Sequence, residues 1–234
     1  MIHIRDLSYR FGDRYALRGV SFSVEKGRFA FLTGPSGSGK TTLLRILHGA
    51  LPVQAGKVGV AGCDLARLNA ARLLQLRRDV AVIFQDFKIL ADRSVYDNIA
   101  LSLRVRGIDE KYVRPRVEAV MAALRLDGEA GRPCRVLAGG EQQRVAIARA
   151  VVCGPRLLLA DEPTGNLDWE LALRLLDILR QVNAHGTTIL MATHNRDLLA
   201  AVPEAPIIRL AGGEADPGGY DLDRASLDAT EAGA

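Results

Sequence analysis

A glycine-rich loop with the spacing G-x-x-x-x-G-K-T lies between an apolar run at 29–33 and an apolar stretch at 43–47. Glycines let the backbone curl so that successive N–H groups point at phosphate oxygens, and the start of a following helix adds about half a positive charge. Here Lys40 reaches the β- and γ-phosphates, and the Thr41 hydroxyl can ligate Mg²⁺. The loop therefore predicts a nucleotide triphosphate site, formed by Gly34, Pro35, Ser36, Gly37, Ser38, Gly39, Lys40, Thr41 and Thr42.

Two carboxylates, Asp161 and Glu162, directly follow the apolar run 157–160. A carboxylate at the end of a buried strand is costly unless it meets a cation, so Asp161 is a predicted ligand of the same Mg²⁺. Adjacent side chains point in different directions, which leaves Glu162 free to polarise the attacking water. A positioned base in this role contributes ~10² to 10⁴-fold. The alternative interpretation is an acidic turn at the surface.

Two further polar residues, Gln85 and His194, follow the apolar runs 80–84 and 187–192. A neutral amide can bind Mg²⁺ or the nucleophilic water, and an imidazole can donate to the γ-phosphate. Each alone is more typical of an ordinary loop, but ligands bind beyond the carboxyl ends of strands in open parallel sheets. We therefore predict one catalytic rim, with Lys40, Gln85, Glu162 and His194 in catalytic roles and with Thr41, Gln85 and Asp161 as metal ligands.

Short apolar runs alternate with helical patterns along the chain. The runs are rich in β-branched or aromatic residues, which predicts an α/β fold with a mostly parallel sheet covered by helices. Alternating apolar residues within the first 27 positions suggest antiparallel strands. The helices expected are one from the N-cap Asp168 to just before Gly186, one at 141–153, and one ending near Leu126. Pro115 is expected either to lie near the first turn of this last helix or to kink it.

The composition limits the class of protein. The chain has 234 residues, of which 48% are apolar, and a formal net charge of +4. The apolar fraction opposes disorder of the whole chain, no run is long enough to span a bilayer, and the charge is too mild for a nucleic-acid binder. The last 22 residues hold six acids and one arginine, which predicts a solvated or disordered tail.

Taken together, the motifs resemble those of ABC-type ATPases. The loop at 34–41 resembles Walker A, and 157–162 resembles Walker B with its catalytic glutamate; Gln85, 167–168 and His194 resemble the Q-loop, D-loop and switch histidine. The most specific match is the signature of this family, LSGGQ/E, which corresponds here to Leu137, Ala138, Gly139, Gly140 and Glu141.

The resemblance covers about residues 2–210, with every motif in order. It implies a P-loop NTPase core at 1–86 and 155–212 that includes an N-terminal antiparallel β-subdomain. It also implies an inserted α-helical subdomain at 87–154, which carries the signature. The segment 213–234 then forms the acidic tail.

The resemblance also implies that two copies pack head to tail around two ATP molecules, so that signature residues and Asp168 of one chain contact the ATP held by the other. Asp168 is equally suited to capping a helix. The aromatic residue that stacks on adenine aligns best with Phe11, although Tyr9 and Tyr15 compete and all three can simply be packing residues. Ala138 replaces the usual serine of the signature, which removes one hydroxyl donor.

The segments 83–90 and 93–98 resemble the cell-division branch of the family. That likeness implies an ATPase on the cytoplasmic face of the inner membrane, bound to an integral membrane partner. The alternative is the ATPase subunit of a lipoprotein-release or macrolide exporter. An ABC ATPase acting on nucleic acid or ribosomes usually has two cassettes or a long coiled-coil insertion, which this chain lacks, so no nucleic-acid partner is expected.

Overall fold

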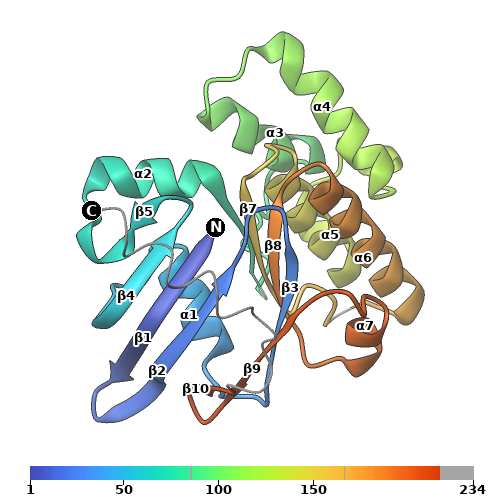
Figure 1. Ribbon diagram of the computed structural model, residues 1–234. Coiled ribbons are helices and arrows are strands. Elements are labelled where there is room, and N and C mark those ends of the chain that lie inside the picture. Colours follow the sequence, from blue (N-terminus) through green and yellow to red (C-terminus); the bar gives the residue numbers. More distant parts are fainter. Residues whose placement is uncertain (85, 166, 217–234) are drawn as a thin grey trace.

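The computed structural model describes residues 1–84, 86–165 and 167–216, which form two sheets with helices packed around them (Figure 1). The strands are β1 (Ile2–Phe11), β2 (Arg14–Val24), β3 (Phe29–Thr33), β4 (Ala55–Val60), β5 (Cys63–Asp64), β6 (Val80–Ile83), β7 (Leu157–Asp161), β8 (Thr188–Ala192), β9 (Ile207–Ala211) and β10 (Glu214–Ala215). The helices are α1 (Lys40–Leu47), α2 (Ala70–Asp79), α3 (Val95–Val105), α4 (Glu110–Ala123), α5 (Gly139–Val151), α6 (Trp169–Ala184) and α7 (Arg196–Ala200).

The larger sheet has the order β10-β9-β3-β8-β7-β6, and its strands from β9 to β6 run parallel. Strands β7 and β8 are buried along their whole length, which explains their continuous apolar sequence. They pair in register from Leu157 opposite Thr188 to Asp161 opposite Ala192. Their carboxyl ends therefore lie side by side, and the four predicted parallel strands are confirmed.

The smaller sheet is antiparallel, with the order β2-β1-β4-β5. Strands β1 and β2 form the predicted antiparallel pair, joined by the turn at 12–13. Apolar side chains of β1 and β2 that face inward, such as Ile2, Leu7 and Val20, are fully buried. This alternation of buried and exposed residues is typical of a sheet with one solvated face.

Strands β9 and β10 extend the parallel sheet beyond β3. Glu214 pairs with Ala211 across a tight turn in which Gly212 and Gly213 adopt φ values of 59° and 86°. Such a turn favours glycine because both positions have positive φ. The predicted tail at 213–234 therefore begins too early, since the fold continues to residue 216. The remainder of that predicted tail, 217–234, lies outside the described residues.

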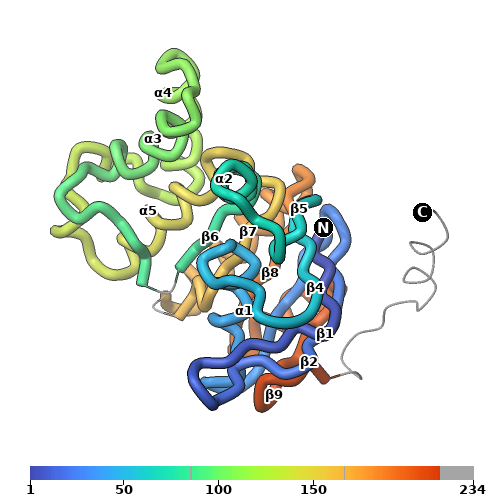
Figure 2. The backbone as a smooth tube through the Cα atoms, turned by 90° about the vertical axis from the view of Figure 1, so that its left-hand side faces the viewer, coloured from blue at the N-terminus to red at the C-terminus, as the bar shows by residue number. Residues whose placement is uncertain are grey.

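Two apolar clusters cover the faces of the parallel sheet. One joins α1 to the antiparallel sheet and contains Leu43, Ile46 and Leu17. The other joins α3, α4, α5 and α6 to residues of the parallel sheet such as Phe31 and Ile83. Figure 2 shows α3, α4 and α5 on one side of the sheet, away from β1 and β2. The three helices lie within the segment 87–154, which we predicted to be a helical subdomain.

The helix boundaries differ slightly from those expected. Helix α5 begins at Gly139, two residues before the predicted start, and α4 begins at Glu110, which places Pro115 in its second turn. Helix α6 begins as predicted, because the Asp168 carboxylate accepts a hydrogen bond from the Leu171 N–H at 2.9 Å. Among the described residues, no helix combines the length and apolar character that crossing a bilayer requires.

Asn98, on α3, is a fully buried polar residue that fixes the segment before this helix. Its Oδ1 accepts from the Leu90 N–H at 2.8 Å. Its Nδ2 lies within hydrogen-bond distance of the carbonyl oxygens of Leu90, Arg93 and Ser94. The amide thus satisfies backbone groups that a short apolar side chain would leave unpaired.

We expect Asn98→Ala to lower the free energy of unfolding by about 3 kcal/mol, because it leaves several buried backbone groups without partners. Urea unfolding followed by circular dichroism measures this change. Asn69→Ala is the matched control, since within the described part of the chain the Asn69 side chain accepts a single hydrogen bond, from the Arg72 N–H at the start of α2. The loss of this bond should cost about 1 kcal/mol. Equal losses in the two variants would contradict the role of Asn98.

Candidate functional site

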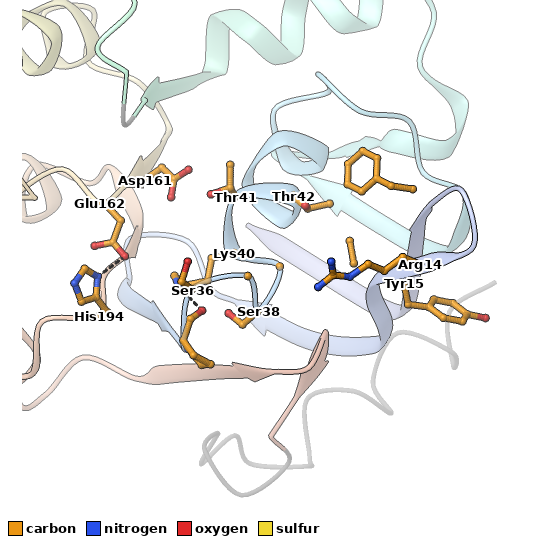
Figure 3. A pocket seen from close by; sticks show the side chains of 15 residues that line it. Arg14, Tyr15, Ser36, Ser38, Lys40, Thr41, Thr42, Asp161, Glu162 and His194 are labelled. Atoms are coloured by element: carbon orange, nitrogen blue, oxygen red, sulfur yellow. Dashed lines mark hydrogen bonds and ion pairs between the residues drawn. The ribbon is translucent and has the colours of Figure 1, made fainter.

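A cavity of about 690 Å³ opens where β3, β7 and β8 end (Figure 3). It lies between the loop after β3, the start of α1 and the turn between β1 and β2. Its lining comes from four distant parts of the sequence and consists mostly of predicted residues: Phe11, Arg14, Tyr15, Ala16, Pro35, Ser36, Gly37, Ser38, Gly39, Lys40, Thr41, Thr42, Asp161, Glu162 and His194. Gln85, the remaining residue predicted for the rim, lies outside the described residues.

Glycine is required at two positions of the loop, because there its backbone passes very close to the backbone of neighbouring strands. Gly34 has φ of 151°, and a Cβ atom there would lie 2.1 Å from the Leu210 carbonyl oxygen. Gly39 has φ of 104°, and its Cβ would lie 2.5 Å from the Ala16 carbonyl oxygen. No side chain could be accommodated at either position without moving a neighbouring strand, so the loop depends on glycine for its path.

The start of α1 presents positive charge to this loop. Gly39 occupies the N-cap position and supplies no side chain to the helix, which leaves its first N–H groups available to an anion. Lys40 is almost buried, and its Nζ donates to the carbonyl oxygens of Gly34 at 2.7 Å and Pro35 at 3.1 Å. The ammonium group is thereby held within the loop, where phosphates would bind.

Asp161 provides an oxygen donor suited to a divalent cation. The residue is 5% exposed, and its Oδ1 is buried without a hydrogen-bond partner among the described residues. Burial raises the pKa of this carboxyl, while a hydrogen bond with Thr41 opposes the shift. A buried carboxylate with an unpaired oxygen beside a hydroxyl is the type of donor set that Mg²⁺ prefers, so Thr41 and Asp161 fit the predicted metal site.

Glu162 and His194 lie together, as Figure 3 shows, although 32 residues separate them in the chain. His194 Nδ1 is 2.9 Å from Glu162 Oε1. Glu162 has φ of 48°, in the left-handed region, and its N–H donates to the Ala192 carbonyl oxygen at 3.0 Å. Such a conformation costs about 1 kcal/mol or more and turns the side chain away from that of Asp161. The two adjacent carboxylates therefore occupy different parts of the rim.

The aromatic residues of the β1–β2 turn differ in their freedom to contact a ligand. Phe11 lines the cavity and is 54% exposed, whereas Tyr9 is buried and packs edge-on against Phe11 with ring centroids 5.0 Å apart. The Tyr15 ring is covered by Arg10 at 3.9 Å and also contacts Arg18. In Figure 3, Tyr15 points away from the phosphate loop. This geometry favours Phe11 for stacking on a base.

The predicted signature residues do not line the cavity of their own chain. The segment 137–141 leads into α5, and within it Ala138 and Gly139 are exposed while Leu137 is buried. The Glu141 carboxylate accepts from the Ala138 N–H at 2.8 Å. Ala138 is the N-cap and has no side-chain oxygen to cap the helix. Since no side chain among the described residues caps them, the first N–H groups of α5 remain available for an anion.

Comparison with known families shows to which family this fold and this combination of motifs belong. A family model for ABC transporters matches residues 17–165, which is more than half of the chain. The chain belongs to the ABC transporter family. Membership confirms the predicted ATPase class, and it accounts for both the glycine-rich loop and the exposed signature helix in one protein.

Curated relatives and solved structures agree with this family. The cell division ATP-binding protein FtsE of Escherichia coli (strain K12) is 47% identical over 81% of this chain and 85% of its own length. FtsE of Mycobacterium tuberculosis is 42% identical over 92% of this chain and 95% of its own. The structure of the ATP-binding cassette MJ0796, a dimeric post-hydrolysis state bound to ADP and Pi, superposes with a TM-score of 0.84 at 30% identity, covering 92% of this chain and 97% of that one. The predicted α/β P-loop fold is confirmed.

Arg14 and Ala16 line the cavity of this ABC ATPase but were not predicted from the sequence. In Figure 3 the Arg14 guanidinium extends toward the loop side of the cavity. The first residues of β2 form no recognisable motif, so only their proximity to the loop in three dimensions identifies them. The approach of Gly39 to the Ala16 carbonyl was a similar long-range contact.

We expect Phe11→Ala to weaken ATP binding about tenfold, because stacking of a base on an aromatic side chain contributes about 1–3 kcal/mol. Tyr15→Ala is the control, and its affinity should stay within about twofold of the wild type because that ring is engaged by two arginines. Titration with a fluorescent ATP analogue measures both. The opposite order of effects would assign the stacking role to Tyr15.

Proposed function

We propose that this chain binds and hydrolyses ATP as one half of a head-to-tail homodimer, and that closure of the dimer drives an integral membrane partner of the FtsX type in cell division. The observation that carries the proposal is the separation of two anion-binding helix starts. The start of α1 lines the cavity, whereas the start of α5 is exposed and lies outside it. A triphosphate bound in the cavity would therefore be contacted by the protein on one side and exposed to solvent on the other.

A second copy supplies the missing face in this proposal. The start of α5 from the partner, with Leu137, Gly139 and Gly140, brings a second set of N–H groups to the γ-phosphate. Hydrolysis then removes the group that both chains hold, which releases the closed dimer. Asp168 caps α6 within its own chain. Its carboxylate therefore already accepts one hydrogen bond within its own chain. A contact with the nucleotide held by the partner would be made in addition to this bond.

Within the cavity, we assign Glu162 as the general base. Its carboxylate accepts a proton from the attacking water while His194, bonded to Oε1, fixes its orientation. Lys40 balances phosphate charge, and its ammonium group exchanges carbonyl partners for phosphate oxygens when a nucleotide binds. Gln85 is the proposed link between the metal site and the helical segment. Mg²⁺, held by Thr41 and Asp161, would neutralise charge on the phosphate oxygens.

The membrane partner is proposed from the relatives. FtsE proteins are named as cell division ATP-binding proteins, and FtsX is the membrane protein with which that branch works. In the proposed complex the ATPase is peripheral on the cytoplasmic face of the inner membrane. A short helix of the partner docks between the helical segment 87–154 and the core. The alternative, an exporter subunit, predicts a different membrane protein at the same surface.

We expect Glu162→Gln to bind ATP normally, to hydrolyse it at least ~10²-fold more slowly and to accumulate as a dimer, because the γ-phosphate is held but not removed. Phosphate release and light scattering measure these effects. The single tryptophan, Trp169, is 47% exposed beside the Asp168 turn, so its fluorescence should report closure. Glu204→Gln, a matched surface change, should behave as the wild type. Hydrolysis by Glu162→Gln at the wild-type rate would refute the assignment.

We expect Ala138→Ser to strengthen ATP-dependent dimerisation, because the added hydroxyl supplies one charge-assisted hydrogen bond worth about 1.5–3 kcal/mol. Sedimentation of the Glu162→Gln protein with and without this change measures the effect as a shift of about tenfold in the dimer dissociation constant. Ala184→Ser, at the exposed end of α6, is the control. An unchanged constant would mean that the backbone N–H groups suffice.

The identity of the membrane partner can be tested by isolating the dimer that Glu162→Gln is expected to form with ATP. Glu162→Gln protein extracted from native membranes with ATP should retain FtsX as its main integral membrane protein, identified by mass spectrometry. Recovery of an exporter subunit in its place would favour the alternative. The wild-type protein without nucleotide provides the baseline for unspecific retention.

A further inference from the structure

A second cavity, of about 240 Å³, lies between the end of α4 and helices α5 and α6, apart from the nucleotide site. Its walls are aliphatic side chains, among them Leu124, Ile147 and Leu175. Three arginines also line it: Arg125 just after α4, Arg144 on α5 and Arg174 on α6. None of the residues in 1–84, 86–165 and 167–216 that line this cavity is acidic, and none of them also lines the nucleotide site.

The arginines are incompletely satisfied by the protein. Arg144 Nε is buried and has no hydrogen-bond partner within the described part of the chain. The side chain of Arg125 likewise has no ion pair or hydrogen bond with any residue in 1–84, 86–165 or 167–216. Arg174 pairs with the exposed Glu170 at 3.2 Å. A buried guanidinium nitrogen without a partner is costly, so an external acceptor would be favoured here.

We propose that this cavity binds a small organic anion, one negative group carried on a compact apolar body. The arginines supply the complementary charge and the N–H donors, while the aliphatic walls cover the apolar part. The volume is below the range of ~300–1,000 Å³ typical of sites for larger ligands. It therefore admits a compact molecule and excludes a folded polypeptide segment.

Leu167 places this cavity beside the loop that follows Glu162 and beside the start of α5. Its side chain lines the cavity and lies 3.5 Å from the position that a Cβ of Gly140 would take. Its N–H donates to the Thr164 carbonyl oxygen at 3.1 Å, within the loop that begins at Glu162. A ligand in contact with Leu167 therefore touches the segment that runs from Glu162 to α6 and packs against the start of α5. We expect its binding to be coupled to hydrolysis through this segment.

Calorimetry with naphthalene-2-sulfonate tests the proposal, with the nucleotide cavity occupied by saturating ADP. We expect one saturable site in the full chain. Arg144→Gln and Arg125→Gln should each weaken binding about tenfold, because each removes a charged contact. Arg116→Gln, an exposed arginine of α4 outside the cavity, should bind as the wild type does. Since Arg125 is exposed, its variant keeps the test valid if Arg144→Gln fails to fold.

Sulfate, which lacks an apolar body, should displace the probe only at concentrations at least about tenfold higher than those of naphthalene-2-sulfonate itself. Saturating probe should change the ATPase rate of the wild type at least twofold and leave that of Arg125→Gln unchanged at the same concentration. Equal probe affinity in all four proteins, or loss of all binding when ADP is present, would overturn the site.

A chain ending at residue 216 separates a free ligand from the acidic segment 217–234. Equal affinity of the full and shortened chains for the probe supports a site for a free small anion. An increase of about tenfold or more on shortening would overturn that assignment, because it would mean that the chain's own carboxylates occupy the arginines.

Discussion

The attraction that a set of backbone N–H groups offers to phosphate charge is the interaction on which the proposed nucleotide site depends. These groups are exposed where β3 turns into α1, and two glycines allow the turn to pass close to neighbouring carbonyl oxygens. Because backbone donors cannot be removed by changing a side chain, the site is a property of the fold. Lys40, Thr41 and Asp161 then add charge and oxygen ligands around a position that the backbone has already defined.

The register of the parallel sheet places the two side chains of the proposed catalytic pair next to this site. Since β7 and β8 end together, Glu162 and His194 meet across their ends, and the left-handed backbone of Glu162 turns its carboxylate away from Asp161. One carboxylate is buried and the other is directed toward the histidine. Two residues that are adjacent in sequence thus acquire different electrostatic surroundings, which suits one to a cation and the other to a proton.

Features carried by contiguous residues could be predicted from the sequence, and those that depend on distant contacts could not. Continuous apolar runs identified β3, β6, β7 and β8, and the loop at 34–41 identified the phosphate site. Strand β10 was missed because two residues carry no periodicity, and it pairs only through the glycine turn before it. Arg14 and Asn98 were missed for a related reason. Their roles depend on neighbours that the fold brings to them. Arg14 belongs to no motif, and the segment 93–98, which contains Asn98, gives no sign of the hydrogen bonds that this residue makes.

The apolar cluster shared by α3, α4, α5, α6 and the parallel sheet limits how the molecule can move. A freely hinged insertion would need an apolar core of its own, whereas here side chains such as Ile99 and Ile147 pack in the same cluster as Phe31. Opening that contact widely would expose a large apolar area to water. In the proposed mechanism, we therefore expect the far helices to respond to the nucleotide by a small sliding displacement between packed surfaces, and not by a wide hinge motion.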